Sequence, residues 1–133
     1  MKLLMAEDDI VSKKLLKNFL DNYGKCDVTI DGKECLEAYV KSMDKGEPYD
    51  LICLDIMMPK MNGVEVLEQI RLEEERRGVA GREMVKIIMT TALDEVDIVM
   101  KSFRKGCESY LIKPILKEKL EEEMIKLDLL KEQ

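Results

Sequence analysis

The chain of 133 residues contains no histidine. This absence excludes Ser–His and Cys–His nucleophile pairs, a histidine general base and most zinc chemistry. The cysteines are few and show no C-x-x-C spacing: Cys26, Cys35, Cys53 and Cys107. We interpret them as reduced, mostly buried thiols of a cytoplasmic protein, with a redox or metal role as the open alternative.

Long apolar runs and an excess of positive charge are also absent. No segment approaches the roughly 20 apolar residues needed to cross a bilayer. The start, "MKLLMAEDD", is too short for a signal peptide because acids follow its apolar stretch at once. The net charge of −6 argues against direct DNA binding. The composition, 46% hydrophobic and 38% charged, is that of a globular protein, and the length predicts one domain, residues 1–133.

Apolar and amphipathic segments alternate five times along the chain. The segments with strand character are 2–6, 26–30, 50–55, 85–92 and 109–114. The segments with helical periodicity are 10–23, 32–46, 63–77, 94–106 and 115–132. Nearly continuous apolar strands between helices predict the α/β class: a doubly wound (βα)5, flavodoxin-like fold whose parallel sheet is covered on both faces. The expected strand order is 2-1-3-4-5, with the alternating segment 26–30 at an edge.

Local signals refine the predicted helices. Asp9 is expected to cap the first helix, with Val11, Leu15, Leu16, Phe19 and Leu20 on its buried face. Asp94 is expected to cap the fourth helix, which ends at Gly106. The fifth helix is expected to continue to within a few residues of the end.

Polar residues follow four of the predicted strands at the point where each apolar run stops. They are Glu7, Asp8 and Asp9 after the first strand, Asp55 after the third, Thr90 and Thr91 after the fourth, and Lys113 before Pro114 after the fifth. The carboxyl ends of parallel strands meet at one crevice, where doubly wound proteins bind ligands. Each residue alone also has an ordinary interpretation as a cap, a β residue, a solvated lysine or a strand terminator.

Together these residues point to phosphoryl chemistry. Clustered carboxylates need a cation, and oxygen ligands without histidine or cysteine suit Mg²⁺. A hydroxyl and an ammonium beside such a metal would neutralise the oxygens of a phosphoryl group. With no histidine available, the nucleophile would be a carboxylate, and the product an aspartyl phosphate.

Four motifs, "EDD" (7–9), "LDIMMPKMNG" (54–63), "TTA" (90–92) and "KP" (113–114), resemble the CheY-like receiver domains of bacterial two-component response regulators. The resemblance implies Asp55 as phospho-acceptor and Asp8, Asp55 and the main-chain carbonyl of Met57 as direct Mg²⁺ ligands, with Glu7 acting through water. It implies that Thr91 and Lys113 contact phosphoryl oxygens and that Tyr110 is an aromatic switch that follows Thr91. It also implies a cis peptide bond before Pro114.

The predicted function is a stand-alone phospho-accepting signalling domain that receives its phosphoryl group from a histidine kinase. It would not be an enzyme beyond self-catalysed phosphoryl acceptance and slow autodephosphorylation, because Met57 and Leu93 would shield the site from water. Output would pass to a protein partner through the face of helix 4, strand 5 and helix 5, where Met100, Lys101, Phe103 and Tyr110 lie; core packing is the alternative for Phe103.

Three alternatives to that function remain open. The first is a phosphorelay intermediate that passes the phosphoryl group to a histidine phosphotransfer protein. The second is a small phosphohydrolase with an Asp nucleophile, although such enzymes typically have a second Asp where Met57 stands. The third is a flavodoxin-like cofactor binder, against which the acidic crevice and the lack of a Gly/Ser/Thr-rich phosphate loop both argue.

Overall fold

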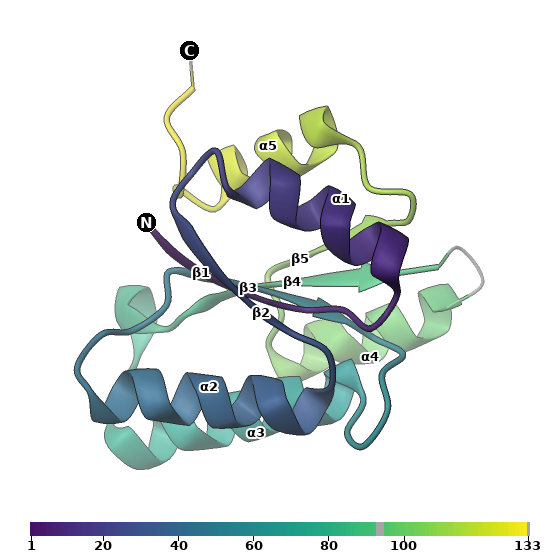
Figure 1. Cartoon of the computed structure of the whole chain (residues 1–133). Helices are drawn as coiled ribbons and strands as arrows, with labels where there is room; N and C mark the ends of the chain where they lie inside the picture. Colours follow the sequence, from purple (N-terminus) through teal and green to yellow (C-terminus); the bar gives the residue numbers. More distant parts are fainter. Residues whose placement is uncertain (93–94, 133) are drawn as a thin grey trace.

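A computed structural model describes residues 1–92 and 95–132 as five parallel strands that alternate with helices (Figure 1). The elements are β1 (Lys2–Ala6), α1 (Ile10–Leu20), β2 (Lys25–Thr29), α2 (Gly32–Asp44), β3 (Leu51–Asp55), α3 (Gly63–Arg77), the short 3-10 helix η1 (Gly81–Glu83), β4 (Lys86–Thr91), α4 (Val96–Lys105), β5 (Ser109–Ile112) and α5 (Lys117–Lys126). The strand order β2-β1-β3-β4-β5 confirms the predicted doubly wound fold.

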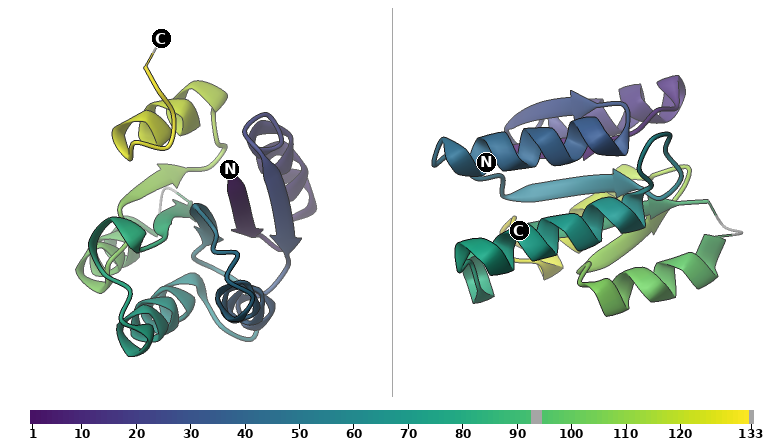
Figure 2. Two further views of the ribbon diagram at one scale, coloured as in Figure 1. Left: turned by 90° about the vertical axis from the view of Figure 1, so that its left-hand side faces the viewer. Right: turned by 90° about the horizontal axis from the view of Figure 1, so that it is seen from below.

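The helices form two layers, one on each face of the sheet (Figures 1 and 2). α1 and α5 cover one face, and α2, α3 and α4 cover the other. Successive strand residues alternate between the two layers. On β1, for example, Leu3 and Met5 face α1 and α5, whereas Leu4 and Ala6 face α2 and α3. This alternation decides which layer each side chain at the ends of the strands faces.

Two details of the predicted helices are wrong. Val11 is 75% exposed, because the first turn of α1 begins beyond the end of β1; Leu16 and Leu20 are the residues of this helix that are fully buried. α5 ends at Lys126 rather than near residue 132, because Asp128 takes a positive φ of 61°. The chain then turns back, and the Leu129 amide donates to the Met124 carbonyl at 2.9 Å. Leu129 and Leu130 therefore pack against the core beside α5.

The first helix also ends earlier than predicted, at Leu20, but the predicted roles of Asp9 and Gly106 at helix ends are confirmed. Asp9 caps α1, since its side chain accepts a hydrogen bond from the Ser12 amide at 2.8 Å. α4 ends at Gly106, which has the left-handed conformation typical of that position. The predicted cap Asp94 lies outside the described residues. Within the described part of the chain, no helix is both long enough and apolar enough to cross a bilayer.

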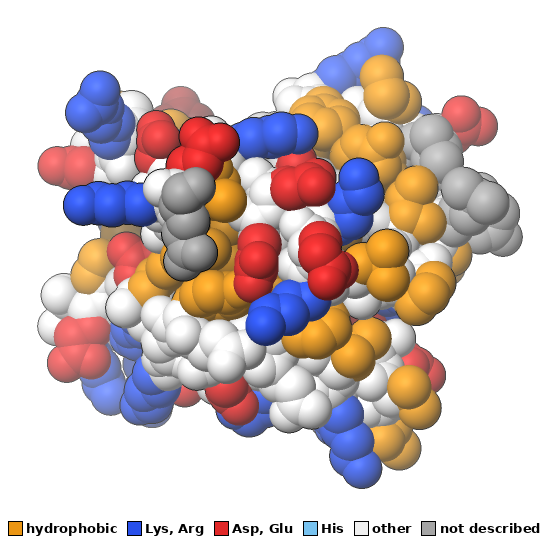
Figure 3. Space-filling model, turned by 90° about the horizontal axis from the view of Figure 1, so that it is seen from above, with side chains coloured by type: hydrophobic (Ala, Val, Ile, Leu, Met, Phe, Trp, Pro, Cys, Tyr) orange, Lys and Arg blue, Asp and Glu red, His pale blue; other side chains and the backbone are white. Residues whose placement is uncertain are grey.

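The surface over α1 and α5 carries acidic and basic side chains close together, while hydrophobic side chains gather toward one end (Figure 3). The exposed hydrophobic residues near the carboxyl ends of the strands include Ile10, Val11 and Leu116, with exposed fractions of 63%, 75% and 56%. This end of the molecule is also where the predicted site lies.

Candidate functional site

Three strands deliver Glu7, Asp55 and Lys113 to one point at the carboxyl edge of the sheet. All three continue the series of strand residues that face α1 and α5. The Lys113 Nζ atom lies 3.2 Å from Asp55 Oδ1 and 2.5 Å from Glu7 Oε1. The Lys113 ammonium thus forms an ion pair with both carboxylates. Glu7 and Asp55 are only 1% and 4% exposed, so two carboxylates are buried beside a single ammonium.

The site has more negative than positive charge. Burial and, after it, the nearby carboxylate of Glu7 together raise the pKa of Asp55 to about 8, against the opposite effect of Lys113. Burial tends to lower the pKa of Lys113, but its contacts with Glu7 and Asp55 outweigh burial and raise it. Without a further cation, Asp55 therefore holds its proton unusually well.

A divalent cation fits this arrangement. Glu7, Asp8 and Asp55 each offer a carboxylate oxygen, and these oxygens lie within 4.8 Å of one another. Asp8 is exposed and leaves the group open to solvent, which suits a metal that keeps several waters. The predicted carboxylate ligands are thus brought together by the fold.

The loop between β3 and α3 is held tightly against Asp55. A Cβ atom on Gly63 would lie 2.3 Å from the Asp55 carbonyl oxygen, so only glycine lets α3 begin here. Asn62 caps α3 in a reciprocal capping box with Glu65. On the other side of the loop, a Cβ on Gly32 would lie 1.8 Å from the Met61 carbonyl oxygen. Met57 lies in this fixed loop, with a side chain that is 57% exposed.

Thr91 and Tyr110 lie on the opposite face of the sheet from the carboxylates, toward α4. The Thr91 hydroxyl donates to Glu95 Oε2 at 3.0 Å, and the Ala92 amide donates to the same oxygen at 3.3 Å. Tyr110 is 37% exposed, and its ring packs edge-to-face on Phe103 with 5.9 Å between ring centroids. Among the described residues, the Thr91 hydroxyl is therefore bonded to Glu95 and not to Asp55, and Tyr110 lies partly exposed against Phe103.

Sequence reasoning did not identify Glu95 as the partner of Thr91. The available signal was the alternation of side chains along a strand, which places Thr90 and Thr91 on opposite faces. The predicted cis peptide bond between Lys113 and Pro114 is present. Leu93, predicted to shield the site with Met57, lies outside the described residues.

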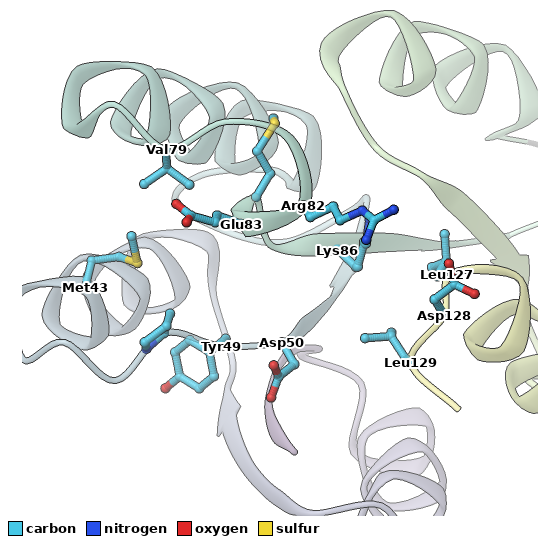
Figure 4. Close-up of a pocket in the computed structure, with 12 residues that line it drawn as sticks. Met43, Tyr49, Asp50, Val79, Arg82, Glu83, Lys86, Leu127, Asp128 and Leu129 are labelled. Atoms are coloured by element: carbon cyan, nitrogen blue, oxygen red, sulfur yellow. The ribbon is translucent and has the colours of Figure 1, made fainter. Parts of the chain in front are cut away.

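A separate cavity of about 590 Å³ lies at the amino-terminal edge of the sheet (Figure 4). Tyr49 and Asp50 precede β3 there, Lys86 begins β4, and Asp128 and Leu129 come from the turn after α5. Its walls carry charges of both signs, and none of the predicted site residues lines it. This cavity is therefore separate from the carboxylate site, which lies at the opposite edge of the sheet.

The fold and the site together define a doubly wound α/β protein with an acidic crevice at its switch point. The family model for the response regulator receiver domain matches residues 3–125. The chemotaxis protein CheY of Listeria monocytogenes is 31% identical over 114 residues, which cover 86% of this chain and 87% of that protein. The chain belongs to the receiver domain family of two-component response regulators.

Two further relatives extend the comparison. Hybrid signal transduction histidine kinase I of Dictyostelium discoideum is 37% identical over 116 residues, which cover 86% of this chain but only 6% of that protein. A chain in the co-crystal structure of the Saccharomyces cerevisiae phosphotransfer protein Ypd1 with the Ssk1 receiver domain has a TM-score of 0.80 at 24% identity. That match covers 99% of this chain and 93% of the other, and it concerns the fold alone.

Proposed function

We propose that the chain accepts a phosphoryl group on Asp55 from a histidine kinase, with Mg²⁺ as cofactor, and that this event changes its binding to a protein partner. The observation that carries the proposal is the burial of Asp55 at a strand end, 3.2 Å from Lys113 and beside the carboxylates of Glu7 and Asp8. A carboxylate fixed by a rigid sheet next to an ammonium can attack phosphorus with little loss of conformational freedom.

The transfer requires one bond to form and one to break. An oxygen of Asp55 forms a bond to phosphorus as the bond between phosphorus and the histidine nitrogen of the kinase breaks. Bound Mg²⁺ would neutralise charge on the phosphoryl oxygens. Asp8, Asp55 and the Met57 carbonyl would bind it directly, and Glu7 through water. Lys113 would pair with one phosphoryl oxygen, and Thr91 would donate to another.

Phosphorylation would then act by shifting an equilibrium between two conformations. Thr91 would exchange its bond to Glu95 for one to the phosphoryl group, and Tyr110 would turn inward. A shift from 1:99 to 99:1 needs about 5.5 kcal/mol, which two or three charge-assisted hydrogen bonds of ~1.5–3 kcal/mol each would supply.

The partner would bind the face formed by α4, β5 and α5. Met100, Phe103 and Tyr110 are 58%, 41% and 37% exposed there, and Lys101 adds a charge at the surface. Phe103 is thus available for contact rather than enclosed in the core. Movement of Tyr110 against Phe103 would change the shape of this face.

The proposal describes a signalling domain in the cytoplasm rather than an enzyme that turns over a substrate. The four cysteines are free and buried, as expected in a reducing compartment. A relay role, in which Asp55 passes the phosphoryl group to a histidine phosphotransfer protein, is the second candidate. It is favoured by the 37% identity to a hybrid histidine kinase.

The experiment compares phosphorylation by acetyl phosphate in the wild type, Asp55→Asn and Asp97→Asn, with Mg²⁺ or with EDTA. Asp97 is an exposed acid on α4 and serves as the matched control. We expect Mg²⁺-dependent incorporation in the wild type and in Asp97→Asn, and none in Asp55→Asn, because an amide is a poor nucleophile. Equal labelling of all three proteins would refute the assignment. Return transfer to purified histidine phosphotransfer proteins separates the relay role from the output role.

A further inference from the structure

Thr90 carries a buried hydroxyl without a hydrogen-bond partner among the described residues. The side chain is 1% exposed. The other buried serine and threonine hydroxyls of the described chain are all bonded, namely those of Thr29, Ser42, Thr91, Ser102 and Ser109. A buried hydroxyl without a partner is unfavourable, and valine would fill the same volume without that penalty. The hydroxyl at position 90 therefore calls for an explanation beyond packing.

The position of Thr90 in the sheet places it beside the phospho-acceptor. Thr90 is the register partner of Asp55 on β3 and of Leu111 on β5. Its side chain follows Ile88 in facing α1 and α5, the same side as Asp55. Adjacent strands lie about 4.8 Å apart, so neighbouring side chains on one face are within reach of each other.

Lys113 reaches Asp55 across the strand that carries Thr90. β4 lies between β3 and β5, and Lys113 comes two residues after Leu111. Its ammonium nevertheless lies 3.2 Å from Asp55 Oδ1. The ion pair between Lys113 and Asp55 thus spans β4, the strand on which Thr90 is the register partner of Asp55.

We propose that Thr90 is a positioning residue for Asp55. Its hydroxyl donates a hydrogen bond to the carboxyl oxygen of Asp55 that does not become bonded to phosphorus. This bond forms when Lys113 leaves Asp55 for a phosphoryl oxygen, so the carboxyl group keeps a donor and its orientation throughout the transfer. The inference rests on the proposed function, because it assumes that Asp55 is the nucleophile.

The test measures the rate of phosphorylation as a function of acetyl phosphate concentration at saturating Mg²⁺. Thr90→Val removes the hydroxyl and keeps the shape. We expect the maximal rate to fall about tenfold, the loss of one hydrogen bond to a charged group. The half-saturating concentrations of acetyl phosphate and Mg²⁺ should stay unchanged, and Thr90→Ser should restore the rate to within about twofold.

The unfolding temperature of the Thr90 variants distinguishes a positioning role of the hydroxyl from a role in packing. Thr90→Val should unfold at the same or a higher temperature than the wild type, because it removes an unpaired buried hydroxyl. A valine variant that is phosphorylated as fast as the wild type would overturn the inference. If valine impairs folding, Thr90→Ser and Thr90→Ala give the same test, since both lose the methyl group and only serine keeps the hydroxyl. Equal rates for those two would also overturn it.

Failure of the inference is distinguishable from failure of the proposed function. Labelling that depends on Asp55 but not on the Thr90 hydroxyl rejects the role of Thr90 alone. Labelling that survives Asp55→Asn rejects the proposed function and this inference with it.

Discussion

Asp55 sits where burial and a neighbouring carboxylate both oppose its ionisation. One lysine balances part of this charge, and the exposed Asp8 adds to the repulsion. This excess of negative charge lowers the stability of the isolated chain, and a bound cation would relieve it. Removal of one carboxylate from this site should therefore weaken metal binding and at the same time stabilise the metal-free protein.

Asp8→Asn is the clearest case of such opposite effects. It removes one of three carboxylates within 4.8 Å of one another, so the metal-free protein should melt at a higher temperature than the wild type. The same change should weaken Mg²⁺ binding by about tenfold or more, since few protein ligands hold this metal. Calorimetry in EDTA and Mg²⁺ titration measure both effects. A lower melting temperature in EDTA would contradict the account.

Glu95→Ala tests whether the hydrogen bond between Thr91 and Glu95 restrains Thr91 in the unphosphorylated protein. Loss of the 3.0 Å hydrogen bond frees the hydroxyl and removes about 1 kcal/mol from the unphosphorylated conformation. The apparent affinity for beryllofluoride with Mg²⁺ should therefore rise roughly fivefold. Asp97→Asn, a neutralised acid in the first turn of the same helix, is the control for charge. If Glu95→Ala and Asp97→Asn bind beryllofluoride with the same affinity, Glu95 does not restrain Thr91.

At the scale of secondary structure elements, a cluster of charged side chains connects α3 with the start of β4 and the start of β5, at the edge of the sheet opposite the carboxylate site. Arg71 on α3 lies 2.6 Å from Glu74 and 2.8 Å from Glu108, and its Nε donates to the Gly106 carbonyl at 3.0 Å. The second oxygens of these two carboxylates accept from the amides of Val85 and Ile87. One arginine therefore supports the start of β4 and the turn before β5.

Arg71→Met should destabilise the protein by about 3–5 kcal/mol, because it leaves two partly or fully buried carboxylates without their cation. Urea unfolding of the variant measures this loss. Arg76→Met is the matched control on the same helix, since Arg76 is 74% exposed and pairs with Glu73 at the surface. The control should change stability by no more than about 0.5 kcal/mol. An equal loss of stability in Arg71→Met and Arg76→Met would show that the buried ion pairs of Arg71 contribute no more than a surface ion pair.

The elements that could be predicted from the sequence are those with unambiguous ends. The predicted range of α3, residues 63–77, is confirmed, and the structure shows Asn62 capping this helix and Gly78 ending it in a left-handed conformation. α5 was predicted too long because its apolar periodicity continues past Lys126, and nothing local reveals that Asp128 adopts a positive φ. Leu129 and Leu130 reach the core through a turn, which tertiary packing and not helical propensity determines.

In the predicted site, too, some features follow from the order of the strands, and others depend on tertiary packing. The meeting of Glu7, Asp55 and Lys113 follows from parallel strands alone. The bond between Thr91 and Glu95 and the isolation of the Thr90 hydroxyl depend on side-chain rotamers and on the path of α4. These cannot be predicted from the sequence, although the alternation of the two threonines could have been.

For the whole molecule, the charge of Asp55 links stability to pH. Its pKa is raised to about 8 in the folded state from 3.8. A carboxyl whose pKa is raised by folding contributes stability that is present below its unfolded pKa and is lost as the pH rises through its folded pKa. The metal-free protein should therefore lose this contribution progressively between about pH 4 and about pH 8.

Asp55→Asn isolates that contribution from the other carboxyls, including Asp9 and Asp31, whose lowered pKa values act in the opposite sense. In EDTA, the melting temperature of Asp55→Asn minus that of the wild type should grow as the pH rises from about 4 to about 8. Mg²⁺ should reduce the difference by stabilising the ionised form. A difference that is independent of pH would mean that Asp55 ionises equally easily in the folded and unfolded chain.

The most direct test of the central claim is to identify the residue that becomes phosphorylated. The protein is treated with acetyl phosphate and Mg²⁺, and the acyl phosphate is reduced with borohydride, which converts a phosphorylated aspartate to homoserine. Peptide mass spectrometry then locates the modified residue. The account predicts homoserine at position 55 in the wild type and its absence when Mg²⁺ is replaced by EDTA. Homoserine at another aspartate, or phosphorylation without reduction at position 55, would contradict it.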